Sequence, residues 1–168
     1  HHGKQELEEI EKIWHGLDMP YTALFAWLDG HGVKPEIKAN ETFHPVMLAN
    51  PLNCERDFQR LNSASYDAEW KWDGIRVQAV FDESSKQLYS RTGDDISRAF
   101  PDIVGELNGK AVLDGELLVG DNFKALPFNQ LQQRLNRKSP TKMHLTNYPA
   151  FIRVYDMLFY NDVDIRDL

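Results

Sequence analysis

The stretch EWKWDGIRVQ, residues 69–78, places a lysine immediately before a turn signal and an alternating segment. Lys71 lies between two tryptophans, and the Asp73-Gly74 pair that follows is typical of a turn or bulge. Every second residue from Ile75 to Phe81 is apolar, a period of two that predicts a β-strand. The stretch therefore predicts a strand that begins just after an ammonium group.

The surroundings of Lys71 suggest a chemical use for its amine. We expect Trp70 and Trp72 to pack near it and to give it a partly apolar setting, with Arg76 as a neighbouring cation. Burial and a nearby like charge both lower the pKa of a lysine. At the ordinary pKa of about 10.4 only about one amine in a thousand is neutral at pH 7.4, so a lowered pKa would create a nucleophile. The competing interpretation is a surface lysine on a strand.

Composition narrows the class of protein. Hydrophobic residues make up 42% and charged residues 27% of the chain, which is typical of a folded globular domain rather than a disordered one. The single Cys54 excludes an internal disulfide framework and a thiolate zinc site. No apolar run is long enough for a membrane helix, and no signal pattern opens the chain, so we expect a cytoplasmic protein. The net charge of -7 means that any contact with nucleic acid must be local.

The first 43 residues predict a short all-α segment. His1-His2-Gly3 is interpreted as the remainder of a purification tag. Apolar residues then recur at helical spacing over 4–17, and a second helix is expected over 19–32, between Pro20 and two glycines. Two helices of this length cannot bury both faces alone, so they look like the end of a helical domain. A change to polar, proline-containing sequence places the boundary near Phe43.

Residues 44–168 predict a second unit of class α+β with a mainly antiparallel sheet. A short strand is expected over 45–50 and a short helix over 54–62. A hairpin is expected from 75 to 93, and a helix split by Pro101 over 94–109. Further strands are expected over 111–120 and 151–160, with a helix opened by Pro127 between them.

Four segments of this unit together resemble the ATP-dependent DNA ligases and related nucleotidyltransferases. KWDGIR (71–76) is similar to their KxDGxR signature, and YSRTG (89–93), LDGELLV (113–119) and VYDMLFYNDVDIRDL (154–168) resemble their later elements in order and spacing. The segment PFNQLQQRLNRK resembles the bacterial enzymes in particular. The resemblance implies an antiparallel-sheet nucleotidyltransferase domain, ATP-grasp-like, preceded by the last helices of a DNA-binding domain.

The resemblance also implies roles for six residues. Lys71 would attack the α-phosphate of ATP and carry AMP, and Glu69 would accept a hydrogen bond from the adenine amino group. Arg76 and Arg91 would contact the ribose, the nucleotide phosphates or the 5'-phosphate of a nick. The remaining two are Glu116, which would bind a ribose hydroxyl or help to hold Mg²⁺, and Tyr155, which would stack on adenine. Gly74 and Gly93 would let the backbone approach the nucleotide.

Plainer interpretations compete with these roles. Glu69 would then pair with a neighbouring cation, Tyr155 would belong to the core, and Asp114-Gly115 would form a tight turn. A basic cluster on the predicted helix is expected to meet the DNA backbone or to be an ordinary solvated face; its members are Arg134, Arg137 and Lys138.

The resemblance further implies that ligase segments follow Leu168, namely metal- and phosphate-binding motifs and an OB-fold. We therefore expect a fragment that is inactive alone, that belongs to a bacterial enzyme acting on nicked duplex DNA, and that self-associates through exposed strand edges. The alternatives are an RNA ligase, an mRNA capping enzyme, or a non-catalytic docking module with the same fold.

Overall fold

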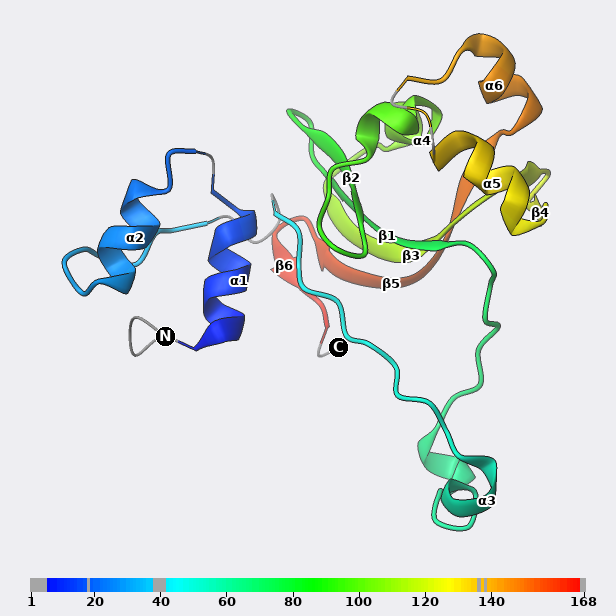
Figure 1. Cartoon of the computed structure of the whole chain (residues 1–168), viewed down its shortest axis with the longest axis horizontal. Helices are drawn as coiled ribbons and strands as arrows, with labels where there is room; N and C mark the ends of the chain where they lie inside the picture. The colour runs from blue at the N-terminus through cyan, green and yellow to red at the C-terminus, as the bar shows by residue number, and fades with distance from the viewer. Residues whose placement is uncertain (1–5, 18, 38–41, 136, 138, 167–168) are drawn as a thin grey trace.

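The computed structural model describes residues 6–17, 19–37, 42–135, 137 and 139–166. The expected tag remnant and Lys138 lie outside these residues. Two helices form a separate layer beside a six-stranded sheet, and a long arm carrying a short helix projects from the sheet (Figure 1). Among the described residues, no helix has both the length and the apolar character needed to cross a membrane.

The predicted helical pair is confirmed. α1 spans Leu7–His15 and α2 spans Thr22–Leu28. Ile13 of α1 packs against Leu24 and Trp27 of α2, and these three side chains form a small core. Helical spacing predicted apolar faces formed by Leu7, Ile10, Trp14 and Leu17 and by Leu24, Phe25 and Leu28. Leu24 is buried as predicted, whereas Leu7, Trp14 and Phe25 are exposed.

The sheet consists of six strands: β1 (Ile75–Phe81), β2 (Lys86–Ser90), β3 (Ala111–Asp121), β4 (Lys124–Ala125), β5 (Ala150–Tyr160) and β6 (Val163–Asp164). It is antiparallel throughout, with strand order β2-β1-β3-β5-β6 and with β4 paired to β3. The hairpin predicted from the sequence is formed by β1 and the edge strand β2, which are joined by a tight turn at Asp82.

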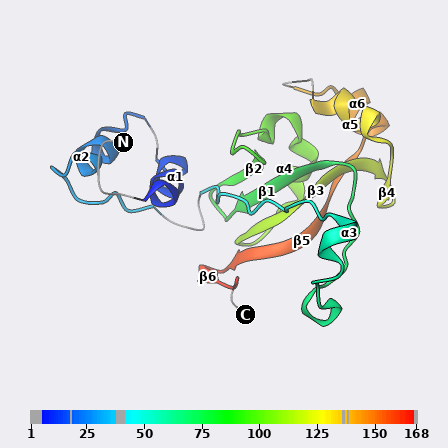
Figure 2. The same cartoon turned by 60° about the horizontal axis from the view of Figure 1, so that its bottom comes forward.

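Helices cover one face of this sheet (Figures 1 and 2). The predicted split helix is instead a short 3₁₀ turn, Ser97–Ala99, followed by α4, Pro101–Glu106. α5 spans Phe128–Leu135, and α6, Lys142–Asn147, was not predicted. The main core lies between this helical layer and alternate residues of the strands, with Phe100, Leu117 and Leu131 at its centre.

The predicted strand over 45–50 is wrong. Residues 43–50 are extended but pair with no strand of the described sheet. The chain then leaves the sheet, forms α3 (Cys54–Asp57) and a 3₁₀ turn (Ser63–Ser65), and returns to β1. Almost every residue of this arm is exposed. An apolar run alone cannot distinguish a strand from an extended segment held by side chains.

The prediction that Arg134 lies on an exposed basic face is also wrong. Its side chain is fully buried, with 0% exposed, beneath α4 and the start of β5. Arg137 is exposed but lies beyond the end of α5, so it does not share a helical face with Arg134.

Candidate active site

The predicted nucleophile lies in the extended segment that leads into β1. Lys71 is exposed, and Gly74 fixes the turn that follows it. A Cβ atom on Gly74 would lie 2.4 Å from the carbonyl oxygen of Leu117, so only glycine permits this approach to β3. The close contact that requires glycine is thus with β3, and it places the turn beside Glu116, whose carboxylate accepts the Gly74 N–H.

Two adjoining hollows on the sheet face opposite the helices contain all six predicted residues. One has a volume of about 550 Å³ and is lined by Lys71, Arg76, Arg91 and Glu116, among others. The other, of about 420 Å³, is lined by Glu69 and Tyr155 together with Lys71, Arg76 and Glu116. Lys71, Arg76, Glu116 and Ala49 line both hollows and make them one continuous candidate site.

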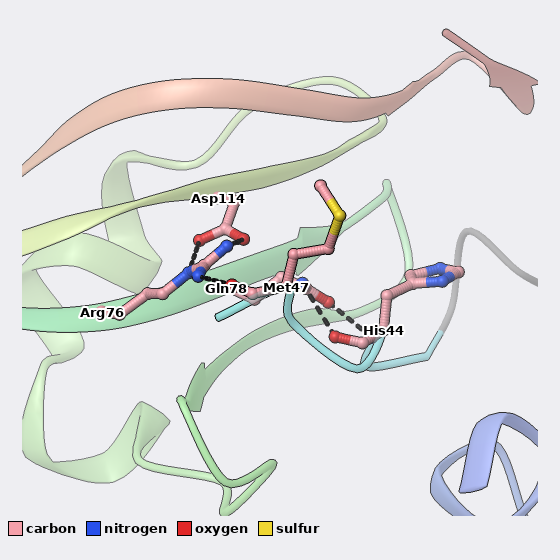
Figure 3. A network of polar contacts seen from close by, with 5 residues as sticks. All are labelled: His44, Met47, Arg76, Gln78 and Asp114. Atoms are coloured by element: carbon pink, nitrogen blue, oxygen red, sulfur yellow. Dashed lines mark hydrogen bonds and ion pairs between the residues drawn. The ribbon is translucent and has the colours of Figure 1, made fainter. Parts of the chain in front are cut away.

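Arg76 is anchored by neighbours on both sides. Its Nε and Nη2 donate to the carboxylate of Asp114, with an Nη2–Oδ2 distance of 2.7 Å, and its Nη1 donates to the carbonyl of Met47 (Figure 3). Asp114 is only 2% exposed and lies on β3, where its backbone pairs with that of Gln78. The hydrogen bond to Asp114 raises the pKa of Arg76, so the guanidinium stays charged. Asp114 is therefore an ion-pair partner, not part of a tight turn.

Glu116 lies opposite Arg76 in the β1–β3 register. Burial raises the pKa of its carboxyl group, while the Gly74 N–H and the charges of Lys71 and Arg76 act in the opposite direction. The carboxylate is thus half-buried among cations and a backbone donor. It is suited to accept hydrogen bonds from a hydroxyl group.

Tyr155 reaches the site because β5 is irregular. The β3–β5 register shifts between Asp114 and Gly115, and Tyr155 is the extra residue at that bulge. Its ring lies over the Arg76 guanidinium, with 5.7 Å from Cζ to the ring centroid. Burial, then the nearby Asp114, raises the pKa of its hydroxyl group, which therefore stays protonated. Tyr155 is part of the candidate site and not of the core.

The two tryptophans differ. Trp72 is half-buried beneath Arg153, whose Cζ lies 4.1 Å from the ring centroid, so the prediction of packing is confirmed there. Trp70 is 86% exposed, and the prediction that it packs is wrong. Both nevertheless line the smaller hollow.

Arg91 projects from a tight turn at the end of β2. The turn is closed by a hydrogen bond from Gly93 N–H to Ser90 O, and the positive φ of 83° at Gly93 favours glycine. A Cβ atom at this position would also collide with His15 of α1. Gly93 therefore serves the turn and the contact with the helical pair.

Residues 46–168 match the family model described as the ATP dependent DNA ligase domain, so the chain belongs to this family. The predicted α+β nucleotidyltransferase fold class is thereby confirmed, and DNA ligase is favoured over an RNA ligase, a capping enzyme or a docking module.

Several known proteins are similar to the chain. A probable DNA ligase of Koribacter versatilis is 35% identical over 70% of this chain and 21% of its own length. A DNA ligase of Pyrobaculum neutrophilum is 30% identical over 97% of this chain and 28% of its own length. The crystal structure of the ligase domain of M. tuberculosis LigD is 27% identical over 54% of this chain and 28% of that one, with a TM-score of 0.42. The chain thus spans less than a third of these curated relatives.

Sequence reasoning missed two polar residues beside the site. Asp114 holds Arg76, and Gln78 is buried on the same side of β1 as Arg76. The alternation of β1 carried a signal for Gln78, because residues two apart on a strand share a face. The dependence of Arg76 on Asp114 joins positions 38 residues apart, and no local pattern shows it.

Proposed function

We propose that this chain is the part of an ATP-dependent DNA ligase that carries the adenylated lysine. The observation that supports the proposal is that the six predicted residues, from four separate segments, line one continuous candidate site. In the reaction, Lys71 Nζ loses a proton and attacks the α-phosphorus of ATP. A P–N bond forms, the bond to the bridging oxygen breaks, and pyrophosphate leaves.

The neighbours of Lys71 suggest how the nucleotide is held. Glu69 and Tyr155 line the smaller hollow, where a carboxylate acceptor and an aromatic face suit the adenine amino group and ring. Arg91 lines the larger hollow and presents an exposed guanidinium to phosphate oxygens. Arg76 has most of its donors committed to Asp114 and Met47, so we assign it to the ribose side with a limited direct contact.

Glu116 fits a magnesium site in which phosphates supply most ligands. Within the residues that the structure describes, no group of three or more His, Cys, Asp or Glu side chains is placed to hold a metal ion. Mg²⁺ is commonly bound through one or two carboxylates together with substrate phosphates, and Glu116 supplies one such carboxylate. The ion would offset the negative charge of the triphosphate, and Glu116 would either contact it or bind the ribose.

The proposed substrate is nicked duplex DNA, and the proposed location is the cytoplasm of a bacterium. Of the members of the predicted DNA-contact set that the structure describes, Arg91 and Arg137 are exposed. Each cation that meets a phosphate adds about one unit to the salt dependence of binding. Arg137→Ala should therefore weaken nick binding for all sequences and lower the slope of log K against log salt by about one.

Labelling with ATP tests the proposal directly. The full-length ligase polypeptide that contains this chain is incubated with α-labelled ATP and magnesium, and we expect acid-stable label on Lys71. Lys71→Ala should abolish the label, whereas Lys124→Ala, which changes another exposed lysine, should retain it. Equal label in the Lys71→Ala protein, or transfer from GTP as efficient as from ATP, would contradict the proposal. We expect residues 1–168 alone to label weakly or not at all.

A further inference from the structure

Residues 42–49, here called the strap, cross the helix-free face of the sheet without joining it as a strand. Instead of backbone hydrogen bonds to a neighbouring strand, the strap has side-chain hydrogen bonds to Gln78 of β1. His44 N–H donates to Gln78 Oε1 at 2.6 Å, and Gln78 Nε2 donates to His44 O at 3.2 Å (Figure 3). The side-chain amide of Gln78 therefore hydrogen-bonds to both the backbone N–H and the backbone carbonyl of His44.

Ring contacts attach the strap on either side of Gln78. The His44 ring stacks on Phe159 of β5 with the centroids 4.9 Å apart. Phe43 packs against Tyr89 of β2 at 5.7 Å. The strap is thus fixed above three strands, with Gln78 at the centre.

The far end of the strap forms a wall of the candidate active site. Leu48 and Ala49 line the larger hollow, and Ala49 also lines the smaller one. The carbonyl of Met47 accepts a hydrogen bond from Arg76, which lines both. Gln78 lines neither of them. The same residues that end the strap therefore shape the space beside Lys71.

The buried position of Gln78 makes its two hydrogen bonds costly to lose. The residue is only 1% exposed. The desolvation penalty of a buried polar group that lacks a hydrogen-bond partner is larger than the net stabilisation that a typical hydrogen bond provides. Removal of this amide also removes its hydrogen bonds to the N–H and the carbonyl of His44. The strap is expected to loosen before the sheet does, because it has no ladder of its own.

We infer that Gln78 is a positioning residue for ATP binding: it holds the strap, and the strap supplies the wall formed by Leu48 and Ala49. The inference rests on the proposed function of the site. Gln78 touches no reacting atom in this scheme. Its loss should weaken ATP binding while chemistry at Lys71 remains.

Hydrogen exchange in the 168-residue chain tests the first half of the inference. Gln78→Met keeps the length of the side chain and removes both hydrogen bonds. We expect exchange of the His44 amide and its strap neighbours to rise about tenfold, with β3 amides changed much less. The matched control is Val77→Ala, which weakens the same strand on the helix-covered face. Unchanged strap exchange in Gln78→Met, or an equal rise in Val77→Ala, would overturn the inference.

Kinetics in the full-length ligase polypeptide test the second half. We expect Gln78→Met to raise the KM for ATP in self-adenylylation about tenfold, with kcat reduced less than about threefold. If Gln78→Met does not fold, His44→Ala keeps the backbone groups that Gln78 binds, removes the ring contact with Phe159, and should raise KM and strap exchange in the same direction. An unchanged KM beside a loosened strap would overturn the inference. Absence of label in the unaltered protein would instead refute the proposed function and leave the exchange result intact.

Discussion

Arg134 and Asp102 form a two-pronged ion pair on the helix-covered side of the sheet, with Nη2–Oδ1 at 2.7 Å and Nη1–Oδ2 at 3.0 Å. Arg134 also donates to the carbonyls of Ala99 and Tyr148, and Asp102 accepts the N–H of Ala150. One guanidinium thus joins α5 to α4 and to the start of β5.

Loss of this ion pair should lower the free energy of unfolding of the chain. Arg134→Ala removes the donors that Arg134 supplies to Asp102 and to two carbonyls, and removal of one partner from a buried ion pair typically costs about 3–5 kcal/mol. Urea denaturation should show this loss. Arg137→Ala, at an exposed position three residues further on, should change stability by less than about 0.5 kcal/mol. Equal stability of Arg134→Ala and the unaltered chain would mean that the pair is not structural.

Glu116→Gln should lose activity without losing stability. Burial raises the pKa of Glu116 above its ordinary value of 4.5, so the folded state holds the proton more tightly than the unfolded state. The unaltered chain therefore loses stability as pH rises from about 4.5 through the folded pKa. The variant lacks this loss. The difference between its free energy of unfolding and that of the unaltered chain, measured by urea titration, should therefore be more favourable to the variant at pH 7 than at pH 4. A relative stability that falls between pH 4 and 7 would contradict this sign.

The label formed by Glu116→Gln should fall about a hundredfold or more, because an uncharged amide replaces the carboxylate beside Lys71. The labelling assay on the full-length polypeptide measures this. Glu106→Gln, at an exposed position of α4, is the matched control and should label normally.

Tyr155 should act through its ring. Tyr155→Phe loses a hydrogen bond with Asp114 but keeps the aromatic face, so the KM for ATP should change by less than about threefold. Tyr155→Ala removes the face, and loss of a base-stacking ring costs about 1–3 kcal/mol, so KM should rise roughly tenfold or more. If Phe and Ala impair binding equally, the hydroxyl group and not the ring is the contact.

Acid should loosen the contact between the helical pair and the sheet. The ring of His15 packs edge-on against Phe43 at 4.9 Å, and burial lowers its pKa from 6.5 against the opposing charges of Glu11 and Asp94. The folded state therefore resists protonation. Stability is unaffected above pH 6.5 and is lost as pH falls from there through the folded pKa.

Hydrogen exchange of α1 between pH 7.5 and 5.5, corrected for intrinsic rates, measures this loss. His15→Gln should remove part of the pH dependence, whereas His31→Gln, at an exposed position after α2, should not. Identical pH profiles for His15→Gln and the unaltered chain would exclude His15 as the titrating group.

Periodicity predicted the parts of the fold that depend on local pattern. The alternation around Val77 and the apolar runs around Leu117 and Phe151 became β1, β3 and β5. The six site residues were predicted by their resemblance to a known set of motifs, and the structure brings them to one place.

The features that were missed depend on partners distant in the sequence. The strap resembled a strand because residues 45–50 are a short, mainly apolar run, but its attachment to Gln78 spans 34 residues. Arg134 resembled a surface cation because its helix is amphipathic, and its partner Asp102 lies 32 residues away. Buried polar groups satisfied by such distant contacts leave no periodic signal in either segment.

The bulges of β5 give this strand two more residues than its partner uses, at Tyr155 and at Leu158. Deletion of one residue there would still allow the backbone to hydrogen-bond to β3. It would, however, move every following side chain of the strand, from Asp156 to Tyr160, to the opposite face of the sheet. Homologous enzymes should therefore tolerate exchanges of side chain in this stretch far better than any change in its length.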